Sequence, residues 1–361
     1  MEIVYVGDLC ESGTCFHRLQ AFRRLGVRVR AFDVGPYMRA GGPLLRRLRD
    51  RLMAGPAIGR LNRDVVRACL ETPAATRVWF DKPLWMQPWA LDRLRQAGRR
   101  LYSFTLDNPF HVMNEPGWHL FRRTIPCFDV NVVPRDSSVA DYRAAGAGAV
   151  ALFPVPFDPV VNHPATPWPP ARSVDVSYVG SPYEERPAFL AGLADRGIAL
   201  RVGGERWGRH PRIRRPGVTL VPAMYGDAYR RAIWDARVNL AFLTRSHHDP
   251  CAHKSMEITA SGSFLLAVRS DGHRAAFEEG REAEFFGSVE EAADKIRFYL
   301  KDETARERVA LAGCRRAWMS GYANDERIAA VFRHTDPELG AGLTRRAAEV
   351  MASRRRELGL E

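Results

Sequence analysis

Short apolar runs that alternate with helical stretches constrain the fold of this chain more than any other feature of its sequence. The first run, Ile3–Val6, is followed by a helical stretch at about Cys15–Leu25 and by a second run at Val27–Phe32. Three more runs follow, separated by helical segments, at Arg77–Phe80, Leu101–Phe104 and Val130–Val133. Apolar strands joined by helices are typical of a parallel sheet covered on both faces. The sequence therefore predicts a doubly wound α/β domain over residues 1–155.

A proline-dense stretch interrupts this alternation. Its prolines are Pro154, Pro156, Pro159, Pro164, Pro167, Pro169 and Pro170. Proline lacks the amide donor and fixes φ, so it disfavours helix interiors and central strands. We therefore expect residues 156–172 to be a linker between two domains.

The alternation then restarts. Five further strands are expected, at Val174–Val179, Ile198–Val202, Val218–Val221, Val238–Leu243 and Phe264–Val268. A helix is expected at Cys251–Ser261, with Gly262 as its stop signal. These elements predict a second α/β domain over residues 173–330. The Arg-rich tail, residues 331–361, is expected to be helical.

Length and composition agree with two globular domains. The chain has 361 residues, of which 46% are hydrophobic, so each half can bury a core. No apolar run reaches the roughly 18 residues that a transmembrane helix needs. The chain opens Met-Glu-Ile-Val-Tyr-Val without a basic n-region, so we expect no signal peptide and a cytoplasmic protein.

The charge is strongly basic, at +12, and almost all of it comes from arginine. The four lysines are Lys82, Lys254, Lys295 and Lys301, and the other 50 basic residues are arginines, which suggests a GC-rich bacterial genome. A basic surface favours anionic partners such as nucleotides, phospholipid headgroups or nucleic acid. Because no helix-turn-helix, RNP or zinc-finger pattern is present, we do not expect nucleic acid to be the partner.

The sequence gives no indication of a metal site. None of the six cysteines forms a C-x-x-C pair, and no two aspartates stand two residues apart in a D-x-D motif. The histidines, His247, His248 and His253 among them, fit no zinc frame. We expect no bound metal and no cofactor.

The stretch His247–Gly262 holds the densest set of candidate functional residues. Asp249, Lys254 and Glu257 fall at or near the start of a helix that follows a strand. The first amides of a helix and a nearby lysine suit a diphosphate, and a carboxylate further along the helix can accept hydrogen bonds from a ribose diol. The alternative is structural: Asp249-Pro250 would cap the helix, and Lys254 and Glu257 would form a surface ion pair.

Other candidates follow strand ends, where open α/β sheets bind their ligands. Gly180-Ser181 and Gly203-Gly204 could let backbone amides approach phosphates, and Trp207 could stack on a base or be a core residue. In the first domain, Gly7 could admit a phosphate. Asp107 is the candidate for a catalytic residue on the acceptor side, with a turn-forming role as its alternative.

These motifs resemble a known family. The Lys254–Leu266 segment, with Glu257-Ile258, Ala260, Gly262 and Phe264-Leu265-Leu266, is similar to the CgeB/YkvP-like glycosyltransferase family. Asp249, eight residues before Glu257, resembles the first position of the E-x7-E signature of GT-B glycosyltransferases. The resemblance continues through Val176–Ser181, Gly203–Gly208 and Tyr229–Leu243, and is weaker in residues 1–155.

The resemblance implies a GT-B fold, in which two Rossmann-like doubly wound domains face an interdomain cleft and the last helix packs back on the N-terminal domain. It implies a hexosyltransferase-like enzyme that uses a nucleotide-diphosphate-sugar such as a UDP-sugar and retains the anomeric configuration. The missing D-x-D motif adds the expectation that the reaction needs no metal. Glu257 would bind the ribose and Lys254 would lie near the diphosphate. Asp249 would lie near the donor sugar, as a second catalytic candidate beside Asp107.

The acceptor is left open as a glycan, a small molecule or a protein. Here Asp249 replaces the first glutamate of the signature, and Pro250–His253 replaces its glycine-rich turn. A non-catalytic GT-B module that binds nucleotide or glycan is therefore the alternative, and a basic nucleic-acid-binding protein is a more distant one.

Two basic stretches remain. Leu44–Met53 is amphipathic and cationic, and we interpret it as a surface helix packed on its own domain, with peripheral contact to an anionic membrane as the alternative. Arg345-Arg346 and Arg354–Arg356 are interpreted as a solvated helix face.

Overall fold

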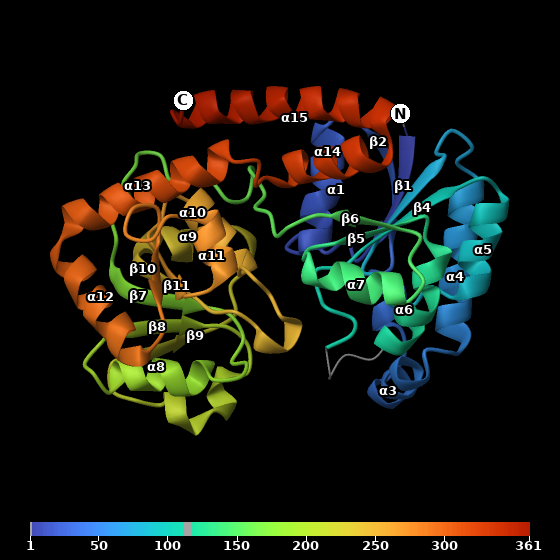
Figure 1. The fold of residues 1–361 in the computed structure, drawn as a ribbon. Coiled ribbons are helices and arrows are strands. Elements are labelled where there is room, and N and C mark those ends of the chain that lie inside the picture. The colour runs from blue at the N-terminus through green and yellow to red at the C-terminus, as the bar shows by residue number, and fades with distance from the viewer. Residues whose placement is uncertain (1, 112–116) are drawn as a thin grey trace. The chain divides into compact units, whose positions relative to one another are not determined.

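The computed structural model of the chain describes residues 2–111 and 117–361 (Figure 1). It divides into two compact units. Unit 1 comprises Met1–Pro154 and Asn324–Val350, and unit 2 comprises Val155–Ala323 and Met351–Glu361. No helix within the described residues has the length and apolar character needed to cross a bilayer.

Unit 1 is built on a six-stranded parallel sheet in the order β2-β1-β3-β4-β5-β6. Its strands are β1 (Glu2–Gly7), β2 (Arg28–Asp33), β3 (Arg77–Asp81), β4 (Arg100–Phe104), β5 (Val130–Val133) and β6 (Ala149–Leu152). The helices are α1 (Thr14–Arg24), α2 (Gly35–Arg39), α3 (Pro43–Leu52), α4 (Pro56–Leu70), α5 (Pro88–Gln96), α6 (Trp118–Thr124), α7 (Ser137–Ala144) and α14 (Asn324–Thr335). The last helix, α15 (Pro337–Leu358), belongs to unit 1 as far as Val350.

Alternate residues of the unit 1 strands point to opposite faces of the sheet, as the two-residue period of a strand requires. Val4 and Phe80 pack under α4, α5 and α6, whereas Tyr5 and Trp79 pack under α1, α14 and α15 (Figure 1). The C-terminal helices are thus part of the unit 1 core. Phe332 of α14 makes ring contacts with three aromatic residues of α1, β3 and β4, namely Phe22, Trp79 and Tyr102.

Unit 2 has a second six-stranded parallel sheet, in the order β12-β11-β10-β7-β8-β9. Its strands are β7 (Val174–Val179), β8 (Leu200–Gly203), β9 (Val218–Val221), β10 (Ala236–Ala241), β11 (Leu265–Val268) and β12 (Glu284–Phe286). The helices are α8 (Arg186–Ala194), α9 (Gly226–Asp235), α10 (His253–Ala260), α11 (Asp271–Ala276), α12 (Val289–Lys301) and α13 (Glu303–Met319). One sheet face packs on α8 and α12, the other on α9, α10 and α11, and α13 contributes to both cores.

The proline-rich residues 156–172, expected to be a linker, lie within unit 2. Their backbone is irregular apart from one bridge between Phe157 and Ala323. Trp168 donates its indole N–H to the carbonyl of Gly262 over 2.9 Å, and the Arg172 guanidinium forms an ion pair with Glu307 at 3.1 Å. The segment therefore packs on the body of unit 2.

Each sheet has one strand that the sequence did not predict, and both are short edge strands. β6 reads Ala-Val-Ala-Leu and β12 reads Glu-Phe-Phe. β12 has only three residues, and β6 is an apolar run that directly precedes the proline-dense stretch. The ten other strands overlap the predicted runs.

Candidate functional site

The order of the strands marks one place in each sheet where a ligand is expected. In unit 2 the chain runs from β7 outward to β9 and then returns to the other side of β7 with β10. The connections after β7 and β10 therefore leave in opposite directions and open a crevice at the carboxyl ends of these strands. In unit 1 the corresponding reversal lies between β1 and β3.

The unit 2 reversal point is lined by closely packed backbone. Gly180, directly after β7, donates its N–H to the carbonyl of Gly203 over 2.8 Å. Gly204 has φ of +143°, and a Cβ there would lie 2.2 Å from the carbonyl oxygen of Gly180. Only glycine fits this position, because the conformation and the contact both exclude a side chain.

Trp207 packs against this turn and donates a hydrogen bond to it. Its side chain is 2% exposed, and its indole N–H donates to the carbonyl of Gly180 over 2.7 Å. The ring packs edge-to-face on Tyr178 in the unit 2 core. The ring therefore offers no open face to a base, which corrects the expectation that Trp207 stacks on a ligand.

Arg186, the first residue of α8, bridges the two strands that flank the reversal point. Its guanidinium donates to the carbonyl of Ser181 after β7, over 3.2 Å. It also donates to the carbonyl of Leu243 and the hydroxyl of Thr244 after β10, over 3.0 and 2.8 Å. A buried cation is thus held beside the crevice, and Ser181 takes part through its carbonyl oxygen.

Lys254 and Glu257 meet Tyr229 at the same place. The ammonium of Lys254 lies 4.8 Å from the centre of the Tyr229 ring, and the Tyr229 hydroxyl donates to Glu257 Oε2 over 2.8 Å. A Cβ at Gly180 would lie 3.1 Å from Cε of Lys254. The structure therefore brings together a lysine, a carboxylate and the glycine turn after β7.

The electrostatics of this cluster follow from its partial burial. Burial lowers the pKa of Lys254, the negative charge of Glu257 opposes that shift, and the positive charge of Arg186 adds to it. Burial and the neighbouring Glu257 charge raise the pKa of Tyr229 well above its ordinary value. Tyr229 therefore stays protonated and remains a hydrogen-bond donor to Glu257.

His273 of α11 fixes the start of α10, which carries Lys254 and Glu257. Nδ1 of His273 lies 2.7 Å from the carbonyl oxygen of Val268, so Nδ1 carries the proton. Nε2 then accepts from the amide of Ala252 over 3.2 Å and from the hydroxyl of Ser255 over 2.9 Å. Burial lowers the pKa of His273 to about 4, which keeps the ring neutral.

Asp249 lies before this helix. α10 begins at His253 with Ala252 as its N-cap, so the alternative in which Asp249-Pro250 caps the helix is wrong. Asp249 Oδ2 is 3.9 Å from Nδ1 of His247.

The sequence reasoning missed Tyr229, Arg186 and His273. Tyr229 begins a segment, Tyr229–Leu243, that resembles the glycosyltransferase family, but no local motif distinguishes Tyr229 or Arg186. Their roles depend on which strands are neighbours, since Arg186 joins the ends of β7 and β10 and Tyr229 reaches α10 from α9. His273 lies in α11, a helix that the sequence pattern does not predict.

The unit 1 reversal point is built around a buried ion pair. Arg18 donates to both carboxylate oxygens of Asp81, over 2.6 and 2.9 Å, with side chains 2% and 1% exposed. The hydroxyl of Tyr5 and the thiol of Cys15 also donate to Asp81, over 2.5 and 3.1 Å. Burial and the Asp81 charge raise the pKa of both donors, so both stay protonated. Gly7 ends β1 beside this group, in unit 1, whereas the other predicted donor-binding residues belong to unit 2.

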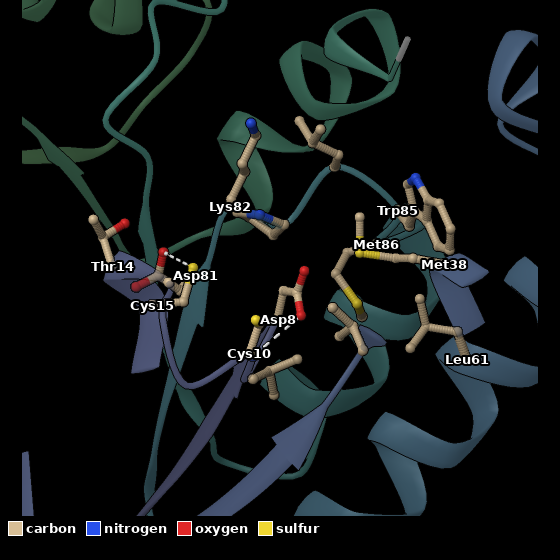
Figure 2. Close-up of a pocket in the computed structure, with 15 residues that line it drawn as sticks. Asp8, Cys10, Thr14, Cys15, Met38, Leu61, Asp81, Lys82, Trp85 and Met86 are labelled. Carbon is tan, nitrogen blue, oxygen red and sulfur yellow. Dashed lines mark hydrogen bonds between the residues drawn. The ribbon is translucent and has the colours of Figure 1, made fainter. Parts of the chain in front are cut away.

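A cavity of about 260 Å³ opens next to this ion pair. In Figure 2, Asp8 lies between Cys15 and Asp81 on one side and Met38, Met86 and Trp85 on the other. The remaining lining is mostly apolar, from Val6, Val34, Leu61, Pro83 and Leu84. The cavity therefore suits an apolar group that carries a polar substituent near Asp8.

Asp107 is held by Lys82, which also lines the cavity. The ammonium of Lys82 lies 2.8 Å from Asp107 Oδ2, and both side chains are partly exposed. Lys82 has a positive φ of 52°, a strained conformation for a residue other than glycine. The ion pair places Asp107 at the same edge of the sheet as the cavity.

Comparison with known protein families locates one match. Residues 186–333 match a family model described as "Glycosyl transferase-like". The match begins at Arg186 and includes Tyr229, Lys254 and Glu257. No curated protein matches the chain by sequence.

Solved structures match the whole chain in fold. Sucrose-phosphate synthase from Thermosynechococcus elongatus is 16% identical with a TM-score of 0.66, over 94% of this chain and 99% of that one. HepE from Anabaena, in complex with UDP-glucose, is 13% identical with a TM-score of 0.60, over 98% and 100%. A glycosyltransferase from Rickettsia africae is 9% identical with a TM-score of 0.61, over 95% and 98%. The chain has the GT-B fold, with two Rossmann-like parallel sheets.

Proposed function

We propose that this protein is a glycosyltransferase that binds a nucleotide-diphosphate-sugar in unit 2 and transfers the sugar to an acceptor bound in unit 1. The cluster of Lys254, Tyr229 and Glu257 beside Gly180 is the observation that carries this proposal. It combines a cation, a carboxylate and close backbone approach at the one place in the sheet where the strand order favours a ligand. The glycosyltransferase-like match over residues 186–333 supports it independently.

Each residue of the cluster has a role in donor binding under this proposal. Glu257 accepts hydrogen bonds from the ribose hydroxyls, and Tyr229 orients its carboxylate. Lys254 and Arg186 neutralise the diphosphate, and the Gly180–Ser181 backbone lines its path. We propose uridine as the base, because HepE, one of the proteins similar in fold, was solved with UDP-glucose.

The proposed reaction breaks the bond between the anomeric carbon and the diphosphate oxygen. The electron pair of that bond leaves with the diphosphate, whose developing charge Lys254 and Arg186 stabilise electrostatically. An acceptor hydroxyl forms the new bond to the anomeric carbon, and its proton passes to the leaving diphosphate. We propose that the anomeric configuration is retained, and NMR of the first product formed tests this directly.

The unit 1 cavity is the proposed acceptor site. Its methionines and Trp85 suit an apolar part of the acceptor, and Asp8 can accept a hydrogen bond from a hydroxyl group. Asp107 would act through its ion pair with Lys82 at the edge of this cavity. Asp249 keeps its proposed place near the donor sugar.

Binding of nucleoside diphosphates tests the donor site. We expect UDP to stabilise the wild-type protein in a thermal-shift panel of UDP, GDP, dTDP, ADP and CMP. Glu257→Gln should weaken binding of the active nucleotide by about 10- to 100-fold, because it removes a charged hydrogen-bond acceptor. Glu290→Gln, at an exposed carboxylate of α12, is the matched control and should bind normally. Equal binding by wild type and Glu257→Gln would contradict the proposed site.

Turnover separates an enzyme from a binding module. We expect release of UDP from UDP-glucose or another UDP-sugar, measured without and with candidate acceptors, and loss of this release in Glu257→Gln. Tight binding of the donor without release under any condition would favour the non-catalytic alternative.

A further inference from the structure

Helix α3 presents an apolar face that unit 1 does not cover. Its leucines Leu44, Leu45, Leu48 and Leu52 are 79%, 66%, 54% and 59% exposed. Their spacing places them along one side of the helix. Figure 1 shows α3 at the margin of unit 1, beyond the end of its sheet. The expectation that this helix packs its apolar face on its own domain is therefore wrong.

The helix is attached through an arginine instead. The guanidinium of Arg49, which is buried, donates to the carbonyls of Tyr37, Met38 and Ala40 over 3.0, 2.9 and 3.1 Å. It also lies 4.3 Å from the ring centre of Trp85. This contact fixes the rotation of α3 and leaves the leucines facing outward.

The polar residues of α3 are strongly cationic. Arg46, Arg47 and Arg51 are wholly or partly exposed, and the one acidic residue, Asp50, forms an ion pair with Arg49 at 2.8 Å. We propose that α3 docks unit 1 on an anionic lipid surface, with its leucines in the acyl boundary and its arginines at lipid phosphates. A short helix with leucines on one side and cationic residues beside them, as Arg47 and Arg51 lie here, has the composition of interfacial helices.

Charge favours lipid over a second copy of this chain as the partner. A symmetric dimer through α3 would bring Arg46, Arg47 and Arg51 of two copies against one another, and the repulsion would oppose burial of the leucines. An anionic lipid surface can bury the leucines of α3 and bind its arginines at the same time. Arg49 of α3 contacts Met38 and Trp85, and these two residues also line the unit 1 cavity. The helix therefore borders the cavity through them.

Flotation of the full-length protein with vesicles tests this proposal. We expect binding to vesicles of phosphatidylcholine with about one third phosphatidylglycerol, weakening as salt rises, and little binding to phosphatidylcholine alone. An arginine near an anionic surface strengthens binding by roughly fivefold, so Arg46→Gln, Arg47→Gln and Arg51→Gln together should weaken it by about 100-fold. Leu44→Ser, Leu45→Ser and Leu48→Ser together should abolish it.

Matched variants keep the result interpretable. Arg345→Gln, Arg346→Gln and Arg356→Gln together remove the same charge from exposed positions of α15, and Leu220→Ser removes an exposed leucine of β9. Both controls should bind vesicles as the wild type does. All variants should keep the wild-type unfolding temperature and nucleotide binding, because the altered side chains are exposed.

Three results would overturn the proposal. The first is equal binding to neutral and anionic vesicles, and the second is an equal loss in the α15 control. The third is a wild-type protein that does not bind vesicles but forms a dimer, which the leucine substitutions dissociate. That result would show that α3 mediates contact between two copies of the chain. A failure of nucleotide binding in every protein, including the wild type, would instead count against the donor site and leave this proposal standing.

Discussion

Each unit has a six-stranded parallel sheet covered by helices, but the residues at the reversal point of the strand order differ between the two. In unit 1 the centre is a buried ion pair, Arg18–Asp81, whose carboxylate also accepts from Tyr5 and Cys15. In unit 2 the centre is a glycine turn with a half-buried lysine, tyrosine and glutamate beside it. Unit 1 therefore satisfies the Asp81 carboxylate internally, whereas unit 2 keeps Lys254, Tyr229 and Glu257 partly exposed.

This difference explains why the two sites suit different ligands. Once Asp81 is satisfied by four donor atoms, the adjoining cavity is left mainly with methionine, leucine, valine and tryptophan surface. In unit 2 the side chains of Lys254 and Glu257 remain partly exposed to a ligand. Two parallel sheets of similar size thus present a mostly apolar cavity in one unit and a cluster of charged groups in the other.

The largest expected effect tests the ion pair of unit 1. Asp81→Asn leaves the Arg18 cation buried without its counter-charge and should lower the free energy of unfolding of unit 1 by about 3–5 kcal/mol. Urea unfolding followed by tryptophan fluorescence measures this. Glu71→Gln, which breaks the exposed Arg30–Glu71 pair, should cost about 0–1 kcal/mol. Nucleotide binding in unit 2 should survive Asp81→Asn under native conditions, and its loss would show that the two sites are not independent.

The next effect concerns His273 of unit 2 and its pH dependence. The unfolded chain protonates this histidine near the ordinary pKa of 6.5, whereas the folded chain protonates it only near 4. The stability that the neutral ring contributes is therefore complete above about pH 6.5 and is lost as pH falls toward 4. The gap between the two pKa values corresponds to about 3 kcal/mol.

Unfolding of wild type and His273→Gln measured between about pH 7 and pH 4 checks this. The variant should be less stable at pH 7, and the difference should shrink as the pH falls. His248→Gln, at an exposed position of the same unit, should keep the wild-type pH profile. A constant difference between wild type and His273→Gln across this range would mean that the ring does not titrate as its burial predicts.

The smallest effect sharpens the description of the unit 2 cluster. Tyr229→Phe removes the hydrogen bond to Glu257 but keeps the ring beside Lys254, so we expect the Kd for the donor nucleotide to rise by about 2- to 10-fold. Tyr225→Phe removes an exposed hydroxyl that donates to Glu205 over 3.2 Å, and it should bind normally. Titration calorimetry distinguishes the two, and equal Kd values would remove Tyr229 from the site.

Much of the fold could be predicted from the sequence because buried parallel strands are continuous apolar runs. Ten strands are predicted in this way. The strands that are not predicted are β6 and β12, the last strand of each sheet along the chain. Pairing with one neighbour stabilises such edge strands, and a few residues carry little pattern of their own. The start of α10 was also misplaced, because His273 binds the Ala252 amide and no side-chain cap marks the helix start.

The candidate site could be predicted only in part. Local motifs identified Gly180, Gly204, Lys254 and Glu257, which the structure brings together. Arg186 and Tyr229 could not be found this way, since the contacts of Arg186 with Leu243 and of Tyr229 with Glu257 join residues 57 and 28 positions apart along the chain. The sequence allows two roles for Trp207, stacking on a base and packing in the core, because an indole after a glycine turn fits both. Only the burial of Trp207 in the structure distinguishes them.

The contribution of α14 to the unit 1 sheet has a consequence for the order in which the protein folds during synthesis. Ribosomes release the N-terminal end first, and domains generally fold as they emerge. Here Trp79 and Tyr102 lack their aromatic partner, Phe332, until nearly the whole chain has been made. The core of unit 1 is thus completed only after residues 155–323 of unit 2 have been translated, and until then its nascent sheet must avoid aggregation.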